Sequence, residues 1–407
     1  MKLACDVAIV GAGVAGLAAM RVLEERGLRT VVLEARDRIG GRILTVRDAR
    51  LAHPIELGAE FVHGSAPEVA EIIDEAGLLA YHIEGQRWRS RGGRLTRLYD
   101  FWKRLDVVMR HLNGDAPDRS FAEFLHDKPG GRSAADERQL ARQFVEGFHA
   151  ADARRISAQA LADGGSPGDD KEEQRMMRIA AGYDAVPAFL ARGLADRVVT
   201  ECVVERIEWQ RGCVELSARG SGARALRSRT IAAQAAIVTV PLGVLLAPSG
   251  EEASIDFVPR LSVLEETRSR LTMGAVVRVV LLFRDRWWTD TLRSLPNEAS
   301  LEAMSFLHGG PADVPVWWSL HPARVPVMVG WAGGPAAERL SGTSTQEMQD
   351  RAVASLAAHL GVSRRRIDSR LEDCWTHDWQ HDPFSRGAYS YALVGAAQFA
   401  SRLARSI

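Results

Sequence analysis

The pattern of hydrophobic and polar positions is most regular at the start of the chain. An apolar run over 6–10 has the length of a buried strand, and the turn Gly11-Ala-Gly-Val-Ala-Gly16 follows it directly. The segment 17–26 predicts an amphipathic helix. A second apolar run, 30–34, ends in an acid. Strand, glycine turn, helix, strand and acid within about 30 residues are the order of a dinucleotide-binding unit.

Each glycine of this turn has a different expected task. Gly11 permits the tight turn, Gly13 lets backbone N–H groups approach a pyrophosphate, and Gly16 lets the helix pack closely on the strand. The positive end of the helix dipole then faces the phosphates. Glu34 is placed to accept hydrogen bonds from a ribose diol, and an acid there disfavours a 2′-phosphate. The ordered context favours dinucleotide binding over a chance glycine turn.

The rest of the chain alternates between two patterns. Segments over 203–209, 213–216 and 235–240 are typical of strands and predict further parts of the nucleotide-binding domain. Residues 85–190 are mostly helical in pattern, with a capping box at Ser120-Phe-Ala-Glu123 and a Gly/Pro/Asp-rich loop over 163–170, whereas 250–390 mix strands and helices. We expect an α/β nucleotide-binding domain at 1–84 and 191–247, an α+β second domain at 85–190 and 248–391, and a last part of the first domain at 392–407.

Composition narrows the class of protein. Hydrophobic residues make up 46% and charged residues 26%, which is typical of a folded globular chain. Lys and Arg number 52 against 52 Asp and Glu, so a nucleic-acid partner, which would favour a basic excess, is not expected. The apolar N-terminus contains Asp6 and three glycines and fits neither a membrane span nor a signal peptide. The four cysteines lie far apart, which disfavours a disulfide framework or zinc site and favours a cytoplasmic location. His377 and His381 lie in a segment whose sequence does not favour a helix, so they are not expected to bind a metal together.

Five segments occur in a defined order along almost the whole chain. They are Gly11-Ala-Gly-Val-Ala-Gly16, Glu34-Ala-Arg-Asp-Arg-Ile-Gly-Gly-Arg42, Glu56-Leu-Gly-Ala-Glu-Phe-Val-His-Gly64, Val238-Thr-Val-Pro-Leu-Gly243, and Trp379 followed by Asp382-Pro-Phe-Ser-Arg-Gly-Ala-Tyr-Ser-Tyr391. In this order they resemble the FAD-dependent amine oxidase family of monoamine and polyamine oxidases, L-amino-acid oxidases and lysine-specific histone demethylases. The resemblance implies a Rossmann-like FAD-binding domain of the glutathione-reductase type, interrupted by the second, substrate-binding domain.

The resemblance also implies which residues hold FAD. Glu34 should hold the adenosine ribose, Arg42 the phosphates and the backbone of Val204 the adenine end. The segment from Gly58 to Phe61 should lie beside the isoalloxazine. The full implied cofactor set is Gly11, Ala12, Gly13, Gly16, Glu34, Ala35, Arg36, Gly41, Arg42, Gly58, Ala59, Glu60, Phe61 and Val204.

Four residues match positions beside the substrate. Tyr389 matches an aromatic residue that faces the flavin, and Trp379 matches the tryptophan beside it. His63 sits where polyamine oxidases place a residue that contacts the substrate. Arg278 stands where many members carry a lysine near flavin N5. Without the family, Trp379 and Tyr389 would be core residues, His63 a loop histidine, and Arg278 an arginine that reaches solvent from an edge strand.

Two further departures from the family matter. Ala388 replaces the cysteine that bonds the flavin in monoamine oxidases, so FAD should be bound non-covalently. The family continues into a strand and helix that close over the flavin, and we expect this chain to lack that C-terminal unit, which would weaken FAD binding.

The implied reaction is hydride transfer from the carbon next to an amine to flavin N5, with O2 reoxidising the flavin to give H2O2. The expected partners are a small amine and O2, with a homodimer as an open alternative. Two rival functions remain open: a flavin desaturase or oxidase acting on C–C bonds, and an inactive or incomplete flavoprotein.

Overall fold

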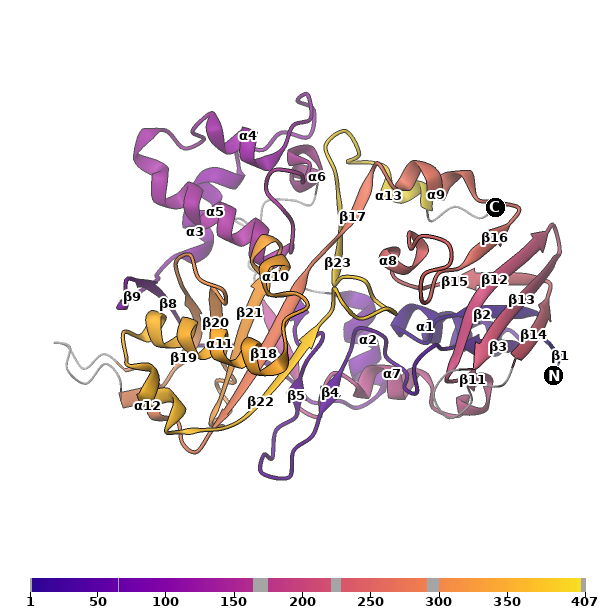
Figure 1. Ribbon diagram of the computed structural model, residues 1–407, viewed down its shortest axis with the longest axis horizontal. Helices are drawn as coiled ribbons and strands as arrows, with labels where there is room; N and C mark the ends of the chain where they lie inside the picture. The colour runs from indigo at the N-terminus through magenta and orange to yellow at the C-terminus, as the bar shows by residue number, and fades with distance from the viewer. Residues whose placement is uncertain (1, 65, 164–174, 221–227, 291–299, 404–407) are drawn as a thin grey trace.

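The computed structural model describes residues 2–64, 66–163, 175–220, 228–290 and 300–403. The two ends of the molecule in Figure 1 are built differently: small sheets that contain the N-terminal strands lie on one side, and a larger sheet with helices packed around it lies on the other. The segment 164–170 of the predicted loop lies outside the described residues.

The glycine turn belongs to a parallel four-stranded sheet. Its strand order is β11 (Val198–Val199), β3 (Thr30–Leu33), β2 (Val7–Val10) and β15 (Ala235–Val238). Helix α1 (Val14–Glu25) connects β2 to β3 and buries Leu17 and Met20 against them. The helix begins three residues earlier than predicted, directly at the glycine turn. A strand from beyond residue 230 therefore completes the sheet that the first forty residues begin.

A second sheet lies beside the first. Its order is β1 (Lys2–Ala4), β14 (Ser228–Ala233), β13 (Cys213–Gly220), β12 (Cys202–Gln210) and β16 (Asp256–Val258). The strands predicted over 203–209, 213–216 and 235–240 are thus present as β12, β13 and β15. The two sheets share a core of aliphatic side chains that includes Val204 and Ile231.

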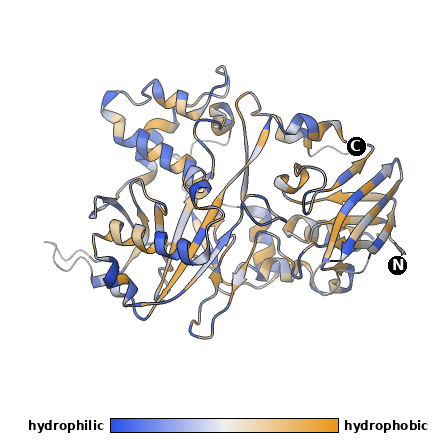
Figure 2. Cartoon of the chain, viewed as in Figure 1, coloured by the Kyte–Doolittle hydropathy of each residue, from blue (hydrophilic) through white to orange (hydrophobic). Residues whose placement is uncertain are grey.

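The large sheet has seven strands. In order they are β22 (Leu371–Asp378), β18 (Val276–Phe283), β21 (Val327–Gly333), β20 (Val316–Ser319), β19 (Met304–His308), β8 (Gln86–Arg91) and β9 (Arg94–Arg97). Helices α10 (Pro335–Leu340), α11 (Thr345–Leu360) and α12 (Arg364–Asp368) pack on one face over the largest hydrophobic core. Figure 2 shows hydrophobic residues concentrated on these strands and hydrophilic residues on the outer sides of the helices.

The helical pattern predicted for 85–190 holds only in its middle part. Helices α3 (Phe101–Met109), α4 (Phe121–His126), α5 (Ala135–Phe148) and α6 (Ala158–Asp163) form a unit with its own core, and Ser120 and Glu123 make the predicted capping box. Before them, β8 and β9 join the large sheet. After them, β10 (Met176–Ile179) pairs with β6 (Val62–His63) and β7 (Ala80–His82), and α7 (Ala185–Leu190) packs on α1. The predicted domain boundaries stay predictions.

Shorter elements join these parts. Strands β17 (Leu271–Gly274) and β23 (Tyr389–Ala392) form a short antiparallel pair in the middle of the molecule, between its two ends (Figure 1). The remaining strands and α-helices are β4 (Thr45–Val46), β5 (Ile55–Glu56), α2 (Pro67–Glu75), α8 (Leu242–Leu245), α9 (Ser262–Thr267) and α13 (Ala400–Leu403). Among the described helices, none combines the length and apolar character needed to span a bilayer.

Candidate active site

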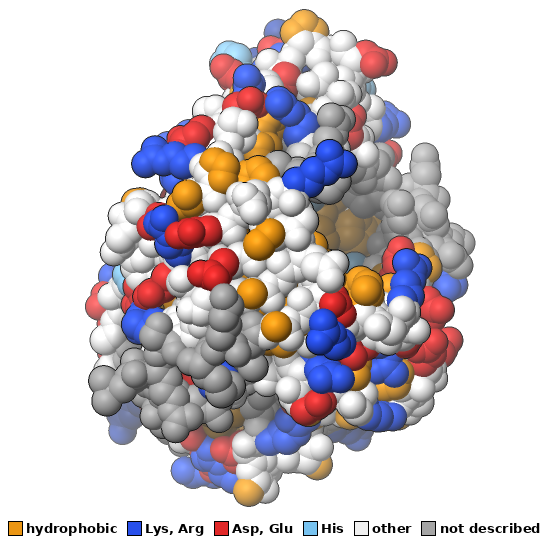
Figure 3. All heavy atoms as spheres, turned by 90° about the vertical axis from the view of Figure 1, so that its right-hand side faces the viewer, with side chains coloured by type: hydrophobic (Ala, Val, Ile, Leu, Met, Phe, Trp, Pro, Cys, Tyr) orange, Lys and Arg blue, Asp and Glu red, His pale blue; other side chains and the backbone are white. Residues whose placement is uncertain are grey.

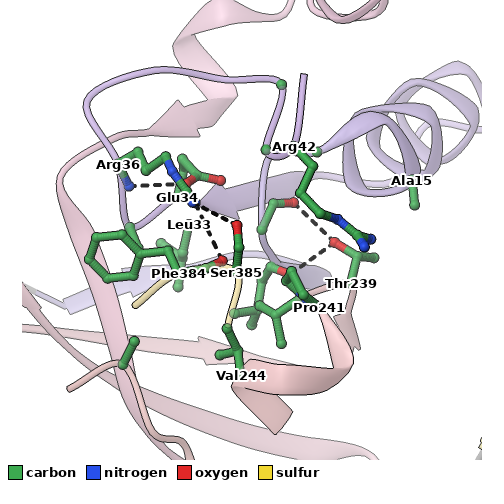
Figure 4. Close-up of a pocket in the computed structure, with 18 of the residues that line it drawn as sticks. Ala15, Leu33, Glu34, Arg36, Arg42, Thr239, Pro241, Val244, Phe384 and Ser385 are labelled. Atoms are coloured by element: carbon green, nitrogen blue, oxygen red, sulfur yellow. Dashed lines mark hydrogen bonds between the residues drawn. The ribbon is translucent and has the colours of Figure 1, made fainter. Parts of the chain in front are cut away.

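A cavity of about 270 Å³ lies at the carboxyl ends of the parallel strands β2, β3 and β15 (Figure 4). Open α/β sheets bind their ligands at this edge, where the strand order reverses. The molecular surface is also hollowed in the view of Figure 3, with hydrophobic side chains in the depth of the recess. The described residues that line the cavity come from the glycine turn, the end of β3, the loop to Ile43, the start of β12, the segment after β15, and Phe384 with Ser385.

The three glycines of the turn are required for different reasons. Gly11 has φ +101°, a conformation that favours glycine. A Cβ on Gly16 would lie 2.0 Å from the Gly11 carbonyl oxygen, so only glycine lets α1 pack here. A Cβ on Gly13 would meet nothing within 4 Å. Since Gly13 borders the cavity, the open space beside it is available to a ligand.

The N-terminus of α1 is suited to an anion. Gly13 is its N-cap residue, no side chain caps the helix, and the first turn carries no acid. The Glu34 carboxylate bonds to Ala12 N just before the helix, and among the described residues no side chain caps the first N–H groups of the helix itself. Such a helix end is the usual binding place of a phosphate.

Glu34 holds the turn together from the end of β3. The side chain is buried, its Oε2 accepts a hydrogen bond from Ala12 N at 2.7 Å, and its Oε1 accepts one from Arg36 N at 3.0 Å. Because each carboxylate oxygen can accept a second hydrogen bond, Glu34 can still bind a ribose hydroxyl.

Arg36 connects this edge to the far end of the chain. Its Nη2 lies 2.7 Å from Asp382 and 2.9 Å from Ser385 Oγ, and its guanidinium lies 5.3 Å from the centre of the Phe384 ring. The guanidinium is thus occupied by an ion pair, and it shapes the cavity wall rather than presenting a free charge.

Arg42, unlike Arg36, presents a charged guanidinium to the cavity. It lines the cavity, its side chain is exposed there, and no carboxylate among the described residues pairs with it. Desolvation by the surrounding protein lowers the pKa of this guanidinium. One Nη donates a hydrogen bond to the carbonyl of Ala388, the residue before Tyr389. An accessible cation opposite an uncapped helix N-terminus fits a diphosphate.

Part of the predicted set of cofactor residues lines this cavity. Gly11, Gly13, Glu34, Ala35, Arg36, Gly41, Arg42, Ala59 and Val204 line it, whereas Ala12, Gly16, Gly58, Glu60 and Phe61 do not. Gly58 is required elsewhere, because a Cβ would lie 2.0 Å from the Arg42 carbonyl oxygen. Sequence reasoning missed Thr239, Phe384 and Ser385 as lining residues, although each lies inside a segment that carried the resemblance.

Glu60 is the centre of a buried ion cluster. Arg178 Nε donates to Glu60 Oε1 at 2.5 Å, Arg278 Nη2 donates to Oε2, and Trp318 Nε1 donates to Oε2 at 3.1 Å. Arg278 also donates to the Gly58 carbonyl at 2.7 Å. Burial lowers the pKa of both arginines to about 10. Two arginines and one glutamate give the cluster a net positive charge.

The cluster decides between the two readings of Arg278. Its guanidinium is held by the carboxylate of Glu60, which also holds Arg178. Arg278 does not reach solvent from an edge strand: β18 lies between β22 and β21, and the side chain is 2% exposed. An arginine tolerates such a position only when it is paired and hydrogen-bonded.

An aromatic row leads from Tyr389 across the sheet. We use this name for Tyr389, Trp331, Trp318, Phe61 and His63. Successive ring centres are 6.4, 6.0, 5.5 and 5.8 Å apart. Such distances are typical of interacting ring pairs.

The two ends of the row are accessible to solvent. The side chains of His63 and Tyr389 are both exposed, and His63 also contacts Phe148 of α5 at 5.2 Å between ring centres. Burial nevertheless lowers the pKa of His63 to about 4 and raises the pKa of Tyr389. At neutral pH His63 is therefore an uncharged side chain facing an open space.

Trp379 belongs to a small buried cluster against which Trp331 of the row packs. It is buried, its Nε1 donates to the Leu57 carbonyl at 3.0 Å, and its ring lies 4.1 Å from His377. It therefore supports the backbone before Gly58. His377 and His381 bond to different carboxylates, Asp382 and Asp378. Within the described residues there is no group of three or more His, Cys, Asp or Glu that could hold a metal.

Comparison with known proteins gives the family of this chain. The family model described as flavin containing amine oxidoreductase matches residues 14–405. The chain belongs to this family. Curated relatives include a flavin-containing amine oxidase of Oncorhynchus mykiss, 23% identical over 95% of this chain and 76% of that protein, and polyamine oxidase 2 of Arabidopsis thaliana, 28% identical over 96% and 78%. FAD is the typical cofactor of the family.

Solved structures confirm the fold. A putrescine oxidase variant superposes with a TM-score of 0.79 at 22% identity, covering 100% of this chain and 92% of that one. Cyclohexylamine oxidase from Brevibacterium oxydans gives 0.76 at 20% identity, covering 99% and 91%. The predicted α/β architecture is thus correct. The expectation that a C-terminal FAD-binding unit is missing is not supported by this coverage.

Proposed function

We propose that this protein is an FAD-dependent amine oxidase that holds its cofactor without a covalent bond. The observation that carries the proposal is the junction formed by Arg42, which faces the dinucleotide cavity and hydrogen-bonds to the backbone of Ala388. The next residue, Tyr389, begins the aromatic row. The dinucleotide cavity is thus linked through Arg42 to the exposed end of the aromatic row, and apolar aromatic side chains are typical of sites for small organic substrates.

Each part of the cavity has a role toward FAD. Glu34 would accept hydrogen bonds from the adenosine ribose. The N–H groups at the start of α1 and the Arg42 guanidinium would hold the diphosphate, and Val204 would line the adenine end. FAD supplies the acceptor for the hydride of the amine substrate. Ala388 offers no thiol for a covalent link, so denaturation in acid should release all FAD from the chain.

The aromatic row would shape the substrate site. Its rings exclude water and fix the orientation of an alkyl amine, which reacts faster when its reacting carbon is positioned. His63 would contact the substrate as a neutral group, because a protonated imidazole would repel an ammonium. Arg278 is held by Glu60 and the Gly58 carbonyl, and it would act on the flavin region through its charge.

A peroxide assay over substrate classes tests the proposal. We expect the FAD-loaded protein to release H2O2 with at least one class among monoamines, polyamines and amino acids. Tyr389→Ala should slow the reaction while the FAD content stays intact, and Tyr389→Phe, which keeps the ring, should retain most of the rate. Turnover restricted to substrates with a reacting C–C bond would replace amine oxidation by the desaturase alternative.

A further inference from the structure

A second arginine lies at the far end of the sheet face that carries the aromatic row. Arg87 on β8 pairs with Phe306 on β19, and Phe306 pairs with Trp318 on β20. On β21, Trp331 pairs with Arg278. Residues directly opposite one another point to the same side of a sheet, so one face carries both arginines with aromatic rings between them.

Arg87 has aromatic neighbours. Its guanidinium carbon lies 4.8 Å from the ring centre of Phe101, 5.5 Å from that of Trp102 and 4.8 Å from that of Phe306. Such contacts orient a guanidinium and leave its N–H edge available. The side chain is half-buried, so it is neither in free solvent nor sealed in the core.

The charge of Arg87 is uncompensated within the part of the chain that the structure describes. Among the described residues, no carboxylate forms an ion pair with Arg87 and no acceptor takes a hydrogen bond from its side chain. Burial lowers its pKa to about 10. The nearby His308 has a pKa lowered to about 3, first by burial and then by the positive charges of Arg87 and Arg89. Arg178 and Arg278, in contrast, share Glu60.

We propose that Arg87 binds an anionic group, a carboxylate, at the end of the amine substrate that does not react. This inference rests on the proposed function and names the substrate class of the same site. A half-buried cation without a partner is costly, and an incoming carboxylate can satisfy it with paired hydrogen bonds. The site therefore selects amines with a distant acid.

The sheet sets the distance between the two ends. From Trp331 on β21 to Arg87 on β8 there are three strand spacings, which amounts to about 14 Å between the backbones. An α-amino acid carries its carboxylate on the reacting carbon and cannot span this distance. A long diamine would place its second ammonium beside Arg87, where like charges repel. A long ω-amino acid satisfies both ends.

Three substrates of equal length separate these possibilities: octylamine, 8-aminooctanoate and 1,8-diaminooctane. With the FAD-loaded protein, we expect kcat/KM for 8-aminooctanoate to exceed that for 1,8-diaminooctane by about tenfold or more. Arg87→Met should lower kcat/KM for 8-aminooctanoate by about tenfold to a hundredfold, as expected for a lost charged hydrogen bond. Octylamine should be affected less than about threefold by the same change.

Matched variants control for charge and folding. Arg87→Lys keeps the charge and should retain part of the preference. Arg89→Met removes an arginine from the same face of β8. Arg89 lies beside the ion pairs Arg91–Asp136 and Arg104–Glu137 rather than among aromatic rings, so the preference should not change. A preference for the diamine in the native protein, or an equal loss for all three substrates in Arg87→Met, overturns the inference.

Failure of the proposed function would be seen separately. If no monoamine, polyamine or amino acid reduces the flavin, amine oxidation is wrong and Arg87 is judged by calorimetry with octanoate. Saturable binding to the native and Arg89→Met proteins, lost in Arg87→Met, supports an anion site. Equal octanoate binding by all three proteins, or none by the native protein, overturns it.

Discussion

The carboxylate of Glu60 and the guanidinium of Arg278 form an ion pair in the interior of the protein, where 2% of either side chain is exposed. Glu60 follows the short strand β5, whereas Arg278 projects from the inner strand β18 of the large sheet. The pair, with Arg178 as a third member, therefore joins the loop beside the dinucleotide cavity to the sheet that carries the aromatic row.

Loss of Glu60 should be strongly destabilising. Glu60→Gln leaves two buried arginines without their shared anion, and breaking a buried pair in this way costs about 3–5 kcal/mol. Urea unfolding measures the change. Glu208→Gln is the matched control, because Glu208 pairs with Arg206 at the surface and should lose less than about 1 kcal/mol. Equal losses in the two variants would contradict a structural role of the cluster.

Arg278 should influence the flavin through its charge. In Arg278→Met, Glu60 stays paired with Arg178, so the cluster loses its net positive charge. Because that charge favours the negative charge gained on reduction, the midpoint potential of bound FAD should fall by about 30 mV or more, or about 1.4 kcal/mol for a two-electron couple. Potentiometric titration measures it, with Arg278→Lys as the charge-conserving control. An unchanged potential would place Arg278 away from the flavin.

Gly13 and Gly16 should respond differently to the same substitution. In Gly13→Val the new side chain meets open space in the protein, so folding should be retained while FAD affinity is lost. In Gly16→Val it would meet the Gly11 carbonyl, so stability should fall. Thermal unfolding and FAD titration separate the effects. A Gly13→Val protein that binds FAD with unchanged affinity would show that this cavity is not the site.

His308 should make the protein sensitive to acid. Its pKa is lowered to about 3 in the folded state, so between about pH 6.5 and pH 3 the unfolded chain binds a proton that the native state does not. Stability therefore falls with decreasing pH, by at most about 1.4 kcal/mol per unit from this residue. His308→Phe should flatten the dependence between pH 7 and 5. Above pH 7 the free energy of unfolding of the two proteins should depend on pH in the same way. An identical slope of this free energy against pH below pH 7 would contradict the lowered pKa of His308.

The sequence was informative where function is encoded locally. The glycine turn and Glu34 are close in sequence, and their order predicted a dinucleotide site. The family resemblance added Arg42, which lines the same cavity. The partners of Glu60 could not be found in this way, because Arg178 and Arg278 follow it by 118 and 218 residues. Arg87 lies in a polar segment, Gln86–Arg91, whose pattern does not reveal a strand in the large sheet. Only the pairing of β8 with β19 brings it to the aromatic face.

Anaerobic reduction of the bound cofactor tests the central claim most directly. The protein is loaded with FAD, oxygen is removed, and amines of each class are added while the flavin absorbance is followed. We predict that at least one amine bleaches the yellow absorbance and that air restores it. A protein that binds no FAD, or a bound flavin that no amine reduces, would contradict the assignment as an amine oxidase.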